Sequence, residues 1–230
     1  MLLVQPLPLR AAGGAELPEA VAGVALPRTP LAQRAAAFGR VKFPDYLFNH
    51  CMRTYVFGAL LLKRSQPSYP AEDAFIGALF HDSGLLPEFA TSKGSFEVDG
   101  ADAAERWVRE NGGSAALANR VWYAVALHDG DPVFARRQGP EALLVLLGAG
   151  ADVDGLEPGE LEARQIAEVL AAFPRLQFKR RFTELLTAHC TRKPNSQNAS
   201  WLERLCDEHA PHPPPADAVE REIAASSFTE

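Results

Sequence analysis

Four polar residues interrupt segments of the chain that are otherwise apolar. His50 lies within YLFNHCMRTYVFGALLL, His81 and Asp82 follow FIGALF, and Asp152 follows ALLVLLGAGA. Imidazole and carboxylate groups together suit a borderline or hard divalent ion such as zinc, iron, nickel or manganese. The pattern therefore predicts one metal site assembled from three separate buried helices.

Each of these residues also has a simpler explanation. His50 could be a hydrogen-bonded core histidine, and Asp152 could be a cap or turn residue in DVDG. His81 could stabilise the negative end of a helix dipole, a position that suits Asp82 badly. Neighbouring side chains diverge by about a third of a turn in mid-helix. His81 and Asp82 can therefore reach one ion only where their helix ends, near Gly84.

The segments that carry these residues show helical spacing of their apolar side chains. Ser114 is the expected N-cap of one helix, and Ser200 with Glu203 forms a plausible capping box for another. No alternating strand pattern is present. The chain is predicted to be all-α, with a helical bundle of about eight helices. We expect helices over 45–64, 71–84, 100–111, 115–130, 140–155, 157–173, 174–190 and 199–209.

The length suits one large domain or two small ones, and the charge argues against some partners. The chain has 230 residues, of which 47% are hydrophobic, and its net charge is −6. This charge argues against a nucleic-acid or anionic-membrane surface. No apolar run approaches the roughly 18 residues of a membrane span. Residues 1–30 are interpreted as a loosely ordered arm, 31–208 as the domain and 209–230 as a tail. An apolar arm of this kind can wrap a second subunit, so a homo-oligomer is an open expectation.

The remaining polar residues give weaker signals. Three cysteines, at positions 51, 190 and 206, are too scattered for a disulfide framework. Reduced thiols and a cytoplasmic location are the simplest interpretation. His189, His209 and His212 have no acidic partner at ligand spacing, and we expect them on the surface. The expected core includes all three tryptophans, at positions 107, 122 and 201.

The order of His50, the His81–Asp82 pair and Asp152 resembles the HD-domain superfamily of metal-dependent enzymes. The longer strings PDYLFNHCMRTYVFGALL, DAFIGALFHDSGL, SFEVDGADAAERW and GADVDGL resemble the branch typified by cyanamide hydratase. The resemblance implies an all-α HD-domain bundle with His50, His81, Asp82 and Asp152 as ligands of one divalent ion. Zinc is expected first, with iron, manganese or nickel as alternatives. Cys51 departs from the family's usual serine and could weaken a hydrogen bond to a ligand.

Three further residues are candidates for proton transfer, substrate contact or pairing with an acid near the ion. Glu97, in GSFEVDGA, could transfer a proton or anchor the substrate, or could simply favour a helix N-terminus. His128 could be a proton shuttle, a substrate contact or a satisfied histidine at a helix end. Dinuclear relatives carry two histidines between the HD pair and the last aspartate, so His128 alone favours one metal. Arg53 lies one turn after His50 and could pair with Asp82 or a nearby acid, or lie on the surface.

The resemblance implies two enzymatic activities. One is a metal-dependent hydro-lyase that adds water to cyanamide, giving urea, or to a related small nitrile. The other is the phosphohydrolase chemistry common in the superfamily. It needs a cationic subsite, for which the strings around the ligands offer few candidates beyond Arg53 and Lys93. A small neutral substrate is therefore favoured. A third hypothesis is a metal-stabilised binding or regulatory protein, which predicts a closed site without turnover.

Overall fold

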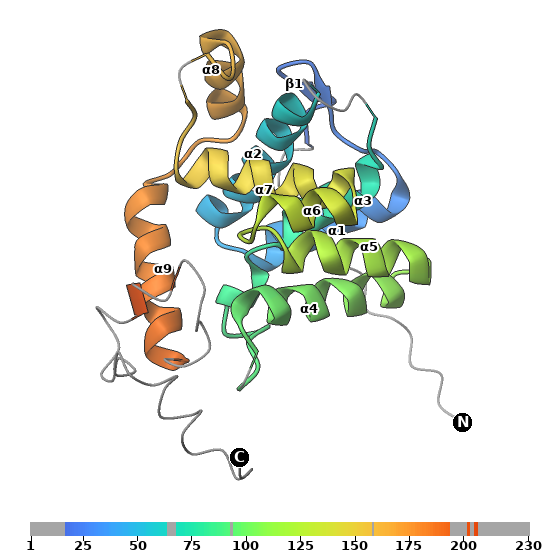
Figure 1. Ribbon diagram of the computed structural model, residues 1–230, viewed down its shortest axis with the longest axis vertical. Helices are drawn as coiled ribbons and strands as arrows, with labels where there is room; N and C mark the ends of the chain where they lie inside the picture. Colours follow the sequence, from blue (N-terminus) through green and yellow to red (C-terminus); the bar gives the residue numbers. More distant parts are fainter. Residues whose placement is uncertain are drawn as a thin grey trace, which may run out of the picture.

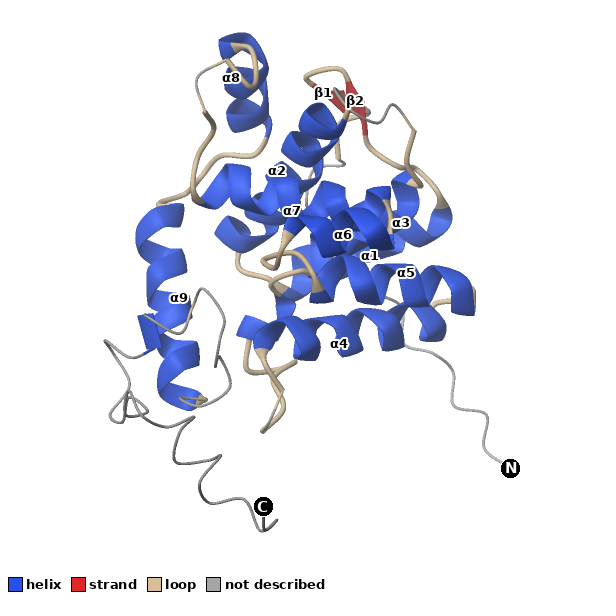
Figure 2. Ribbon diagram, viewed as in Figure 1, coloured by secondary structure: helices blue, strands red, loops and turns tan. Residues whose placement is uncertain are grey.

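The computed structural model describes residues 17–63, 68–92, 94–157, 159–193, 202 and 205–206. Over these residues the predicted all-α fold is confirmed, with nine α-helices and one two-stranded hairpin (Figures 1 and 2). No helix in these ranges is both long and apolar enough to cross a membrane. The helices are α1 (Pro30–Lys42), α2 (Asp45–Leu62), α3 (Ala71–Phe80), α4 (Phe96–Glu110), α5 (Ala115–Ala126), α6 (Pro132–Gln138), α7 (Pro140–Val153), α8 (Ala163–Ala172) and α9 (Phe178–Arg192).

Helices α2 and α7 cross at the centre of the bundle (Figure 1), and glycines let their backbones touch. A Cβ on Gly58 would lie 2.1 Å from the carbonyl oxygen of Leu144. A Cβ on Gly148 would lie 1.9 Å from the carbonyl oxygen of Thr54. Only glycine fits such an approach. The crossing places the end of α7, which carries Asp152, beside the α2 residues that follow His50.

Helix α3 ends four residues earlier than the sequence predicts. Its last residue is Phe80, and a short 3₁₀ turn, η1 (Ser83–Leu85), follows directly. The turn packs against α4, where a Cβ on Gly84 would lie 2.0 Å from the carbonyl oxygen of Phe96. His81 keeps helical angles, with φ −54° and ψ −38°, whereas Asp82 turns to φ −99° and ψ 5°. This change of direction brings the two side chains together, as expected for a loosened helix end.

Residues 17–29 belong to the folded domain rather than to a loosely ordered arm. Strand β1 (Ala20–Val21) pairs antiparallel with β2 (Val24–Ala25). Both valines and Leu26 are buried, and the Tyr55 hydroxyl donates a hydrogen bond of 3.2 Å to the carbonyl of Ala25. The hairpin is too short for the alternating pattern that identifies a strand in sequence.

The sequence analysis also missed two helices, α1 and α6. Each has a capping residue followed by proline, namely Thr29–Pro30 and Asp131–Pro132, and both side chains accept backbone hydrogen bonds. This signature could have revealed them. The expected N-cap Ser114 is confirmed, since its hydroxyl accepts from the Leu117 amide at 3.1 Å. Residues 1–16, Lys93, Trp201, the capping box at 200–203, and the tail with His209 and His212 lie outside the described residues.

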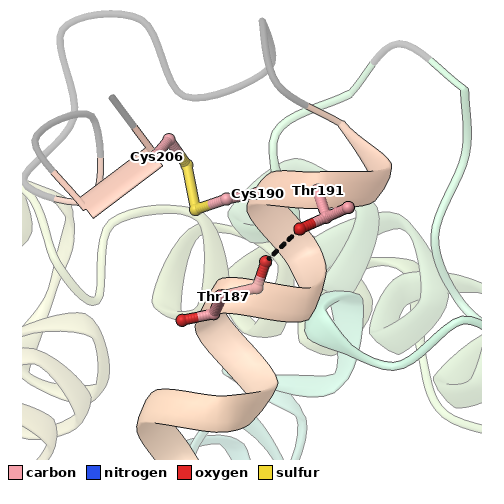
Figure 3. Close-up of a disulfide and its surroundings, with 4 residues drawn as sticks. All are labelled: Thr187, Cys190, Thr191 and Cys206. Carbon is pink, nitrogen blue, oxygen red and sulfur yellow. Dashed lines mark hydrogen bonds between the residues drawn. A yellow bond between two sulfur atoms is a disulfide. The ribbon is translucent and has the colours of Figure 1, made fainter. Parts of the chain in front are cut away.

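The interpretation of all three cysteines as reduced thiols is wrong. Cys190 of α9 forms a disulfide with Cys206, sixteen residues further along the chain (Figure 3). Both cysteines are buried, and Leu202 is buried as well. The disulfide therefore fastens this part of the C-terminal segment to the end of α9. Cys51 remains a free, buried thiol.

Replacing Cys206 with serine is expected to lower the free energy of unfolding by about 3 kcal/mol. The disulfide removes the closure entropy of a loop of about 15 residues from the unfolded chain. Denaturant unfolding of the wild type and of Cys206→Ser, each with and without a dithiol reductant, measures the effect. The reductant should destabilise the wild type only. Equal stability of all four samples would contradict a structural role for the disulfide.

Candidate metal centre

Three side-chain atoms from α2 and the end of α3 converge in the interior. The Nε2 atoms of His50 and His81 are 3.0 Å apart. Oδ2 of Asp82 lies 3.1 Å from Nε2 of His50 and 3.2 Å from Nε2 of His81. All three residues are buried, and their geometry is that of a group able to hold a metal ion. The structure thus brings together three of the four residues that the sequence predicts as ligands.

The hydrogen bond made by Nδ1 of each imidazole ring shows which nitrogen carries the proton. Nδ1 of His81 lies 2.8 Å from the Ala78 carbonyl, which can only accept, so Nδ1 is the donor. Nδ1 of His50 lies 2.7 Å from Oδ2 of Asp152 and is a donor for the same reason. In the neutral rings, both Nε2 lone pairs then face Asp82, whose Oδ2 has no hydrogen bond of good geometry. Three electron-rich atoms this close could hold a cation between them, and their types suit a divalent metal.

The charges of the group fit this interpretation. Burial would raise the pKa of Asp82, but His81 and His50 hold it well below its usual range, so the carboxylate is ionised. Burial lowers the pKa of His81, which favours the neutral ring that a metal needs. Burial also opposes charge on His50, yet its hydrogen bonds to Asp152 and Asp82 outweigh this and raise its pKa. A proton and a metal ion therefore compete for Nε2 of His50.

Asp152 lies on the far side of the His50 ring from the three converging atoms. Its Oδ2 contacts Nδ1 of His50 at 2.7 Å. Arg53 donates to both carboxylate oxygens, from Nε to Oδ1 at 2.8 Å and from Nη2 to Oδ2 at 2.7 Å. Nη1 of Arg175 adds a contact of 2.7 Å to Oδ1. The sequence analysis expected Asp152 among the ligand atoms. In the structure its carboxylate instead contacts Nδ1 of His50, away from the three converging atoms. This contact makes Asp152 the carboxylate that orients His50, a common partner of metal-binding histidines.

Arg53 is fully buried, which excludes the surface position left open by the sequence. It pairs with Asp152 rather than Asp82, and its Nη1 donates to the carbonyls of Phe173 at 3.1 Å and Pro174 at 3.3 Å. Burial raises the pKa of Asp152, but the hydrogen bonds and charges of His50 and Arg53 outweigh burial and leave the pKa below its usual value. The donors of Arg53 are thus shared between the Asp152 carboxylate and two backbone carbonyls.

His128 and Cys51 lie close to the three converging atoms. Nε2 of His128 is 3.6 Å from Oδ1 of Asp82, and its Nδ1 donates to the Val125 carbonyl at 2.6 Å. The ring packs edge-on against His81, with 4.8 Å between centroids. His128 therefore turns its Nε2 atom towards the group. Burial and the Asp82 charge raise the pKa of the Cys51 thiol well above its usual value, so it stays protonated.

Glu97 is buried at the start of α4, and its Oε2 atom has no hydrogen-bond partner. Burial and the neighbouring Asp129 raise the pKa of Glu97 to about 8. Asp129 directly follows His128 in the chain, so Glu97 adjoins the His128 side of the centre. Glu97 is therefore a carboxylic acid at neutral pH, a state suited to donating a proton.

The raised pKa of Glu97 predicts a loss of stability with rising pH. Between its ordinary pKa of 4.5 and about 8, the folded state holds a proton that the unfolded state releases. Stability should then fall by up to about 1.4 kcal/mol per pH unit in this window. Glu97→Gln should remove that slope, whereas Glu105→Gln on the outer face of α4 should keep it. Urea unfolding at several pH values measures it, and parallel curves for all three proteins would refute the prediction.

Aromatic side chains from α9 and α4 line the centre. The Phe178 ring stacks on His50 with 4.6 Å between centroids, and Phe182 lies 5.4 Å from the same ring. Phe96 lies 5.5 Å from His128 and 5.8 Å from His189. His189 is buried on α9, so the predicted surface position is wrong. Burial, together with the charge of Lys193, lowers the pKa of His189 to about 4. The spacing of Phe178, Phe182, Leu186 and His189 along one helix face could have revealed this.

A scan against models of known protein families finds no match, and a search of curated proteins finds no significant relative. The fold and the centre therefore define the class of protein. It is an all-α bundle with a buried group of two histidines and one aspartate that could hold a metal ion.

Proposed function

We propose that this protein is an HD-type, metal-dependent hydro-lyase that adds water to cyanamide, or to a related small nitrile, and forms urea or an amide. The observation that carries the proposal is the convergence of Nε2 of His50, Nε2 of His81 and Oδ2 of Asp82. The resemblance of the surrounding sequence strings to the cyanamide hydratase-type branch supports it. The expected ion is a single divalent metal, zinc before iron, manganese or nickel.

Each polar residue has a role in this proposal. His50, His81 and Asp82 would hold the ion, which when bound acts as a Lewis acid and lowers the pKa of water. Nε2 of His128, beside Asp82, accepts a proton from the attacking water. Glu97, protonated at neutral pH, returns a proton to the product nitrogen. The Asp152 carboxylate keeps the proton of His50 on Nδ1.

The surroundings favour a small neutral substrate over a phosphoester. Arg53, a candidate cation for a phosphate subsite, is engaged with Asp152 and two carbonyls. Arg175 also binds Asp152, and the rings of Phe178 and Phe182 cover His50. Phosphohydrolase activity remains the alternative. The burial of all three ligand residues favours a second candidate as well, a metal-stabilised binding protein without turnover.

A cytoplasmic location also remains part of the proposal. The disulfide between Cys190 and Cys206 counts against it, because such bonds are rare in that compartment. A homo-oligomer remains an expectation as well.

Metal analysis and two activity assays test the proposal. The purified protein is analysed for metals, stripped with a chelator, reloaded with zinc, iron, manganese or nickel, and assayed with cyanamide for urea. A nucleotide panel is assayed for phosphate in parallel. Metal-dependent urea formation is the expected result. Phosphate release without urea would replace the hydratase by the phosphohydrolase, and bound metal with neither product would favour the binding protein.

The role of Asp152 is tested against its neighbour Asp154, which is exposed at the end of α7. Asp152→Asn should weaken metal affinity by about 10- to 100-fold, the usual effect of losing a carboxylate that orients a ligand histidine. Asp154→Asn should bind metal like the wild type. Competition with a chromophoric chelator measures both affinities. A complete loss of metal in folded Asp152→Asn would instead make Asp152 a direct ligand, and loss only in Asp154→Asn would refute both assignments.

A further inference from the structure

Helix α9 covers one side of the candidate metal centre. It runs along one side of the bundle in Figure 1. The Phe178 ring at its start stacks on the His50 ring, and Phe182 lies 5.4 Å from that ring, measured between centroids. His50, His81 and Asp82 are each at most 2% exposed. A metal ion or a substrate can therefore reach the converging atoms only when a covering element moves.

Polar contacts anchor the two ends of α9 but not its first half, residues 178–186. Just before the helix, the Asn49 side chain donates to the Pro174 carbonyl at 2.9 Å. In its last turn, Arg192 donates to the Leu85 carbonyl at 2.7 Å. Within the part of the chain that the structure describes, no hydrogen bond or ion pair joins residues 178–186 to another helix or strand. This half can therefore separate from the bundle without breaking such a contact.

The two residues that connect the anchored segment to α9 have a strained backbone. Leu176 and Gln177 have φ of 50° and 62°, in the left-handed region that residues with a side chain rarely adopt. Both side chains are exposed, so their own burial does not compensate for the strain. The contacts of Pro174 on one side and Phe178 on the other hold the pair in place instead. Strain of this kind is concentrated where a chain switches conformation.

We propose that residues 178–186 form a lid over the metal centre, with Leu176 and Gln177 as its hinge, and that metal and substrate enter when the lid opens. This inference rests on the proposed metal centre but not on the reaction that takes place there. Opening relieves the left-handed strain and gives up the aromatic contacts with His50, so the two effects oppose each other. The closed lid keeps water away from the converging atoms, as lids in enzymes commonly do.

Glycine at the hinge should slow the exchange of metal. Glycine adopts left-handed angles without strain, so Leu176→Gly should favour the closed lid. We expect zinc to leave this variant about 10-fold more slowly, because the left-handed region costs other residues about that factor in equilibrium constant. Ala22→Gly is the matched control, since Ala22 also has φ 50° but lies in the hairpin. Transfer of zinc to a chromophoric chelator measures the rates, and unchanged release in Leu176→Gly would overturn the proposal.

A chemical test needs neither metal nor activity. Diethyl pyrocarbonate modifies histidines that reagent can reach, and peptide mass analysis gives the rate at His50 in the metal-free protein. Leu176→Gly should slow this reaction about 10-fold, Phe182→Ala should accelerate it, and Ala22→Gly should leave it unchanged. The rate at His189, buried at the anchored end of α9, should stay constant and so exclude global unfolding.

The two tests separate the lid from the proposed reaction. A rate at His50 that neither Leu176→Gly nor Phe182→Ala changes would overturn the lid, whether or not urea forms. Rates at His50 that follow the expected order in protein without hydratase activity would sink the proposed reaction and support the lid.

Discussion

Replacing His81 with alanine is expected to lower metal affinity by more than about 100-fold and to abolish metal-dependent activity. His81 supplies one of three converging donor atoms, and its loss should cost more than the 10- to 100-fold typical of an outer partner. The effect should be one of binding rather than of folding. Apo His81→Ala should unfold at a denaturant concentration near that of the apo wild type, because it relieves the repulsion between converging lone pairs.

His189→Ala is the matched control for this prediction. His189 is also a buried histidine, but it lies on α9 against Phe96 rather than in the converging group. This variant should lose stability and keep its metal. Elemental analysis of both proteins after dialysis, with chelator competition for the affinities, decides the result. Equal metal retention in the two variants would refute the proposed centre.

Replacing Arg53 with methionine is expected to lower the free energy of unfolding by about 3 to 5 kcal/mol. Removing one partner of a buried ion pair leaves the other charge buried without full compensation. Asp152 would keep His50 and Arg175 but lose the paired contacts at 2.7 and 2.8 Å. Arg53→Lys should recover little, because an ammonium cannot grip both carboxylate oxygens in the same geometry.

Arg175→Met is the control for Arg53, because it removes a guanidinium from the same carboxylate. The Arg175 side chain is 31% exposed, so water can replace its contacts, and we expect a loss of about 1 kcal/mol. Denaturant unfolding of the three variants gives the comparison. A loss for Arg53→Met no larger than that for Arg175→Met would show that burial of the pair contributes nothing.

The helices that carry the centre were predictable because their signals are local. The apolar spacing around His50, the acidic first turn and proline before α3, and the Ser114 cap all lie within a few residues of the elements they specify. The early end of α3 was not predictable. It depends on the contact of Gly84 with α4, which lies outside the local pattern.

The roles of Asp152 and Arg53 depend on how two helices cross. A carboxylate can serve a metal site as a ligand or as the partner of a ligand histidine. The sequence leaves open whether it meets the metal or the Nδ1 side of the imidazole ring. The close approach of α2 and α7 at Gly58 and Gly148 sets how the two helices cross. This crossing places Asp152 at the Nδ1 side of the His50 ring. A wider crossing would move this carboxylate relative to the ring.

By itself, the sequence determined the all-α class and the residues able to hold a metal. Helical periodicity and donor chemistry are properties of short segments, so no contact between distant segments was needed to recognise them. Only the tertiary structure decided which atoms meet. The convergence of His50 with His81 and Asp82, the Cys190–Cys206 disulfide and the burial of His189 all depend on contacts between segments far apart in the chain. The packing of one helix against another sets such distances, and no local pattern encodes them.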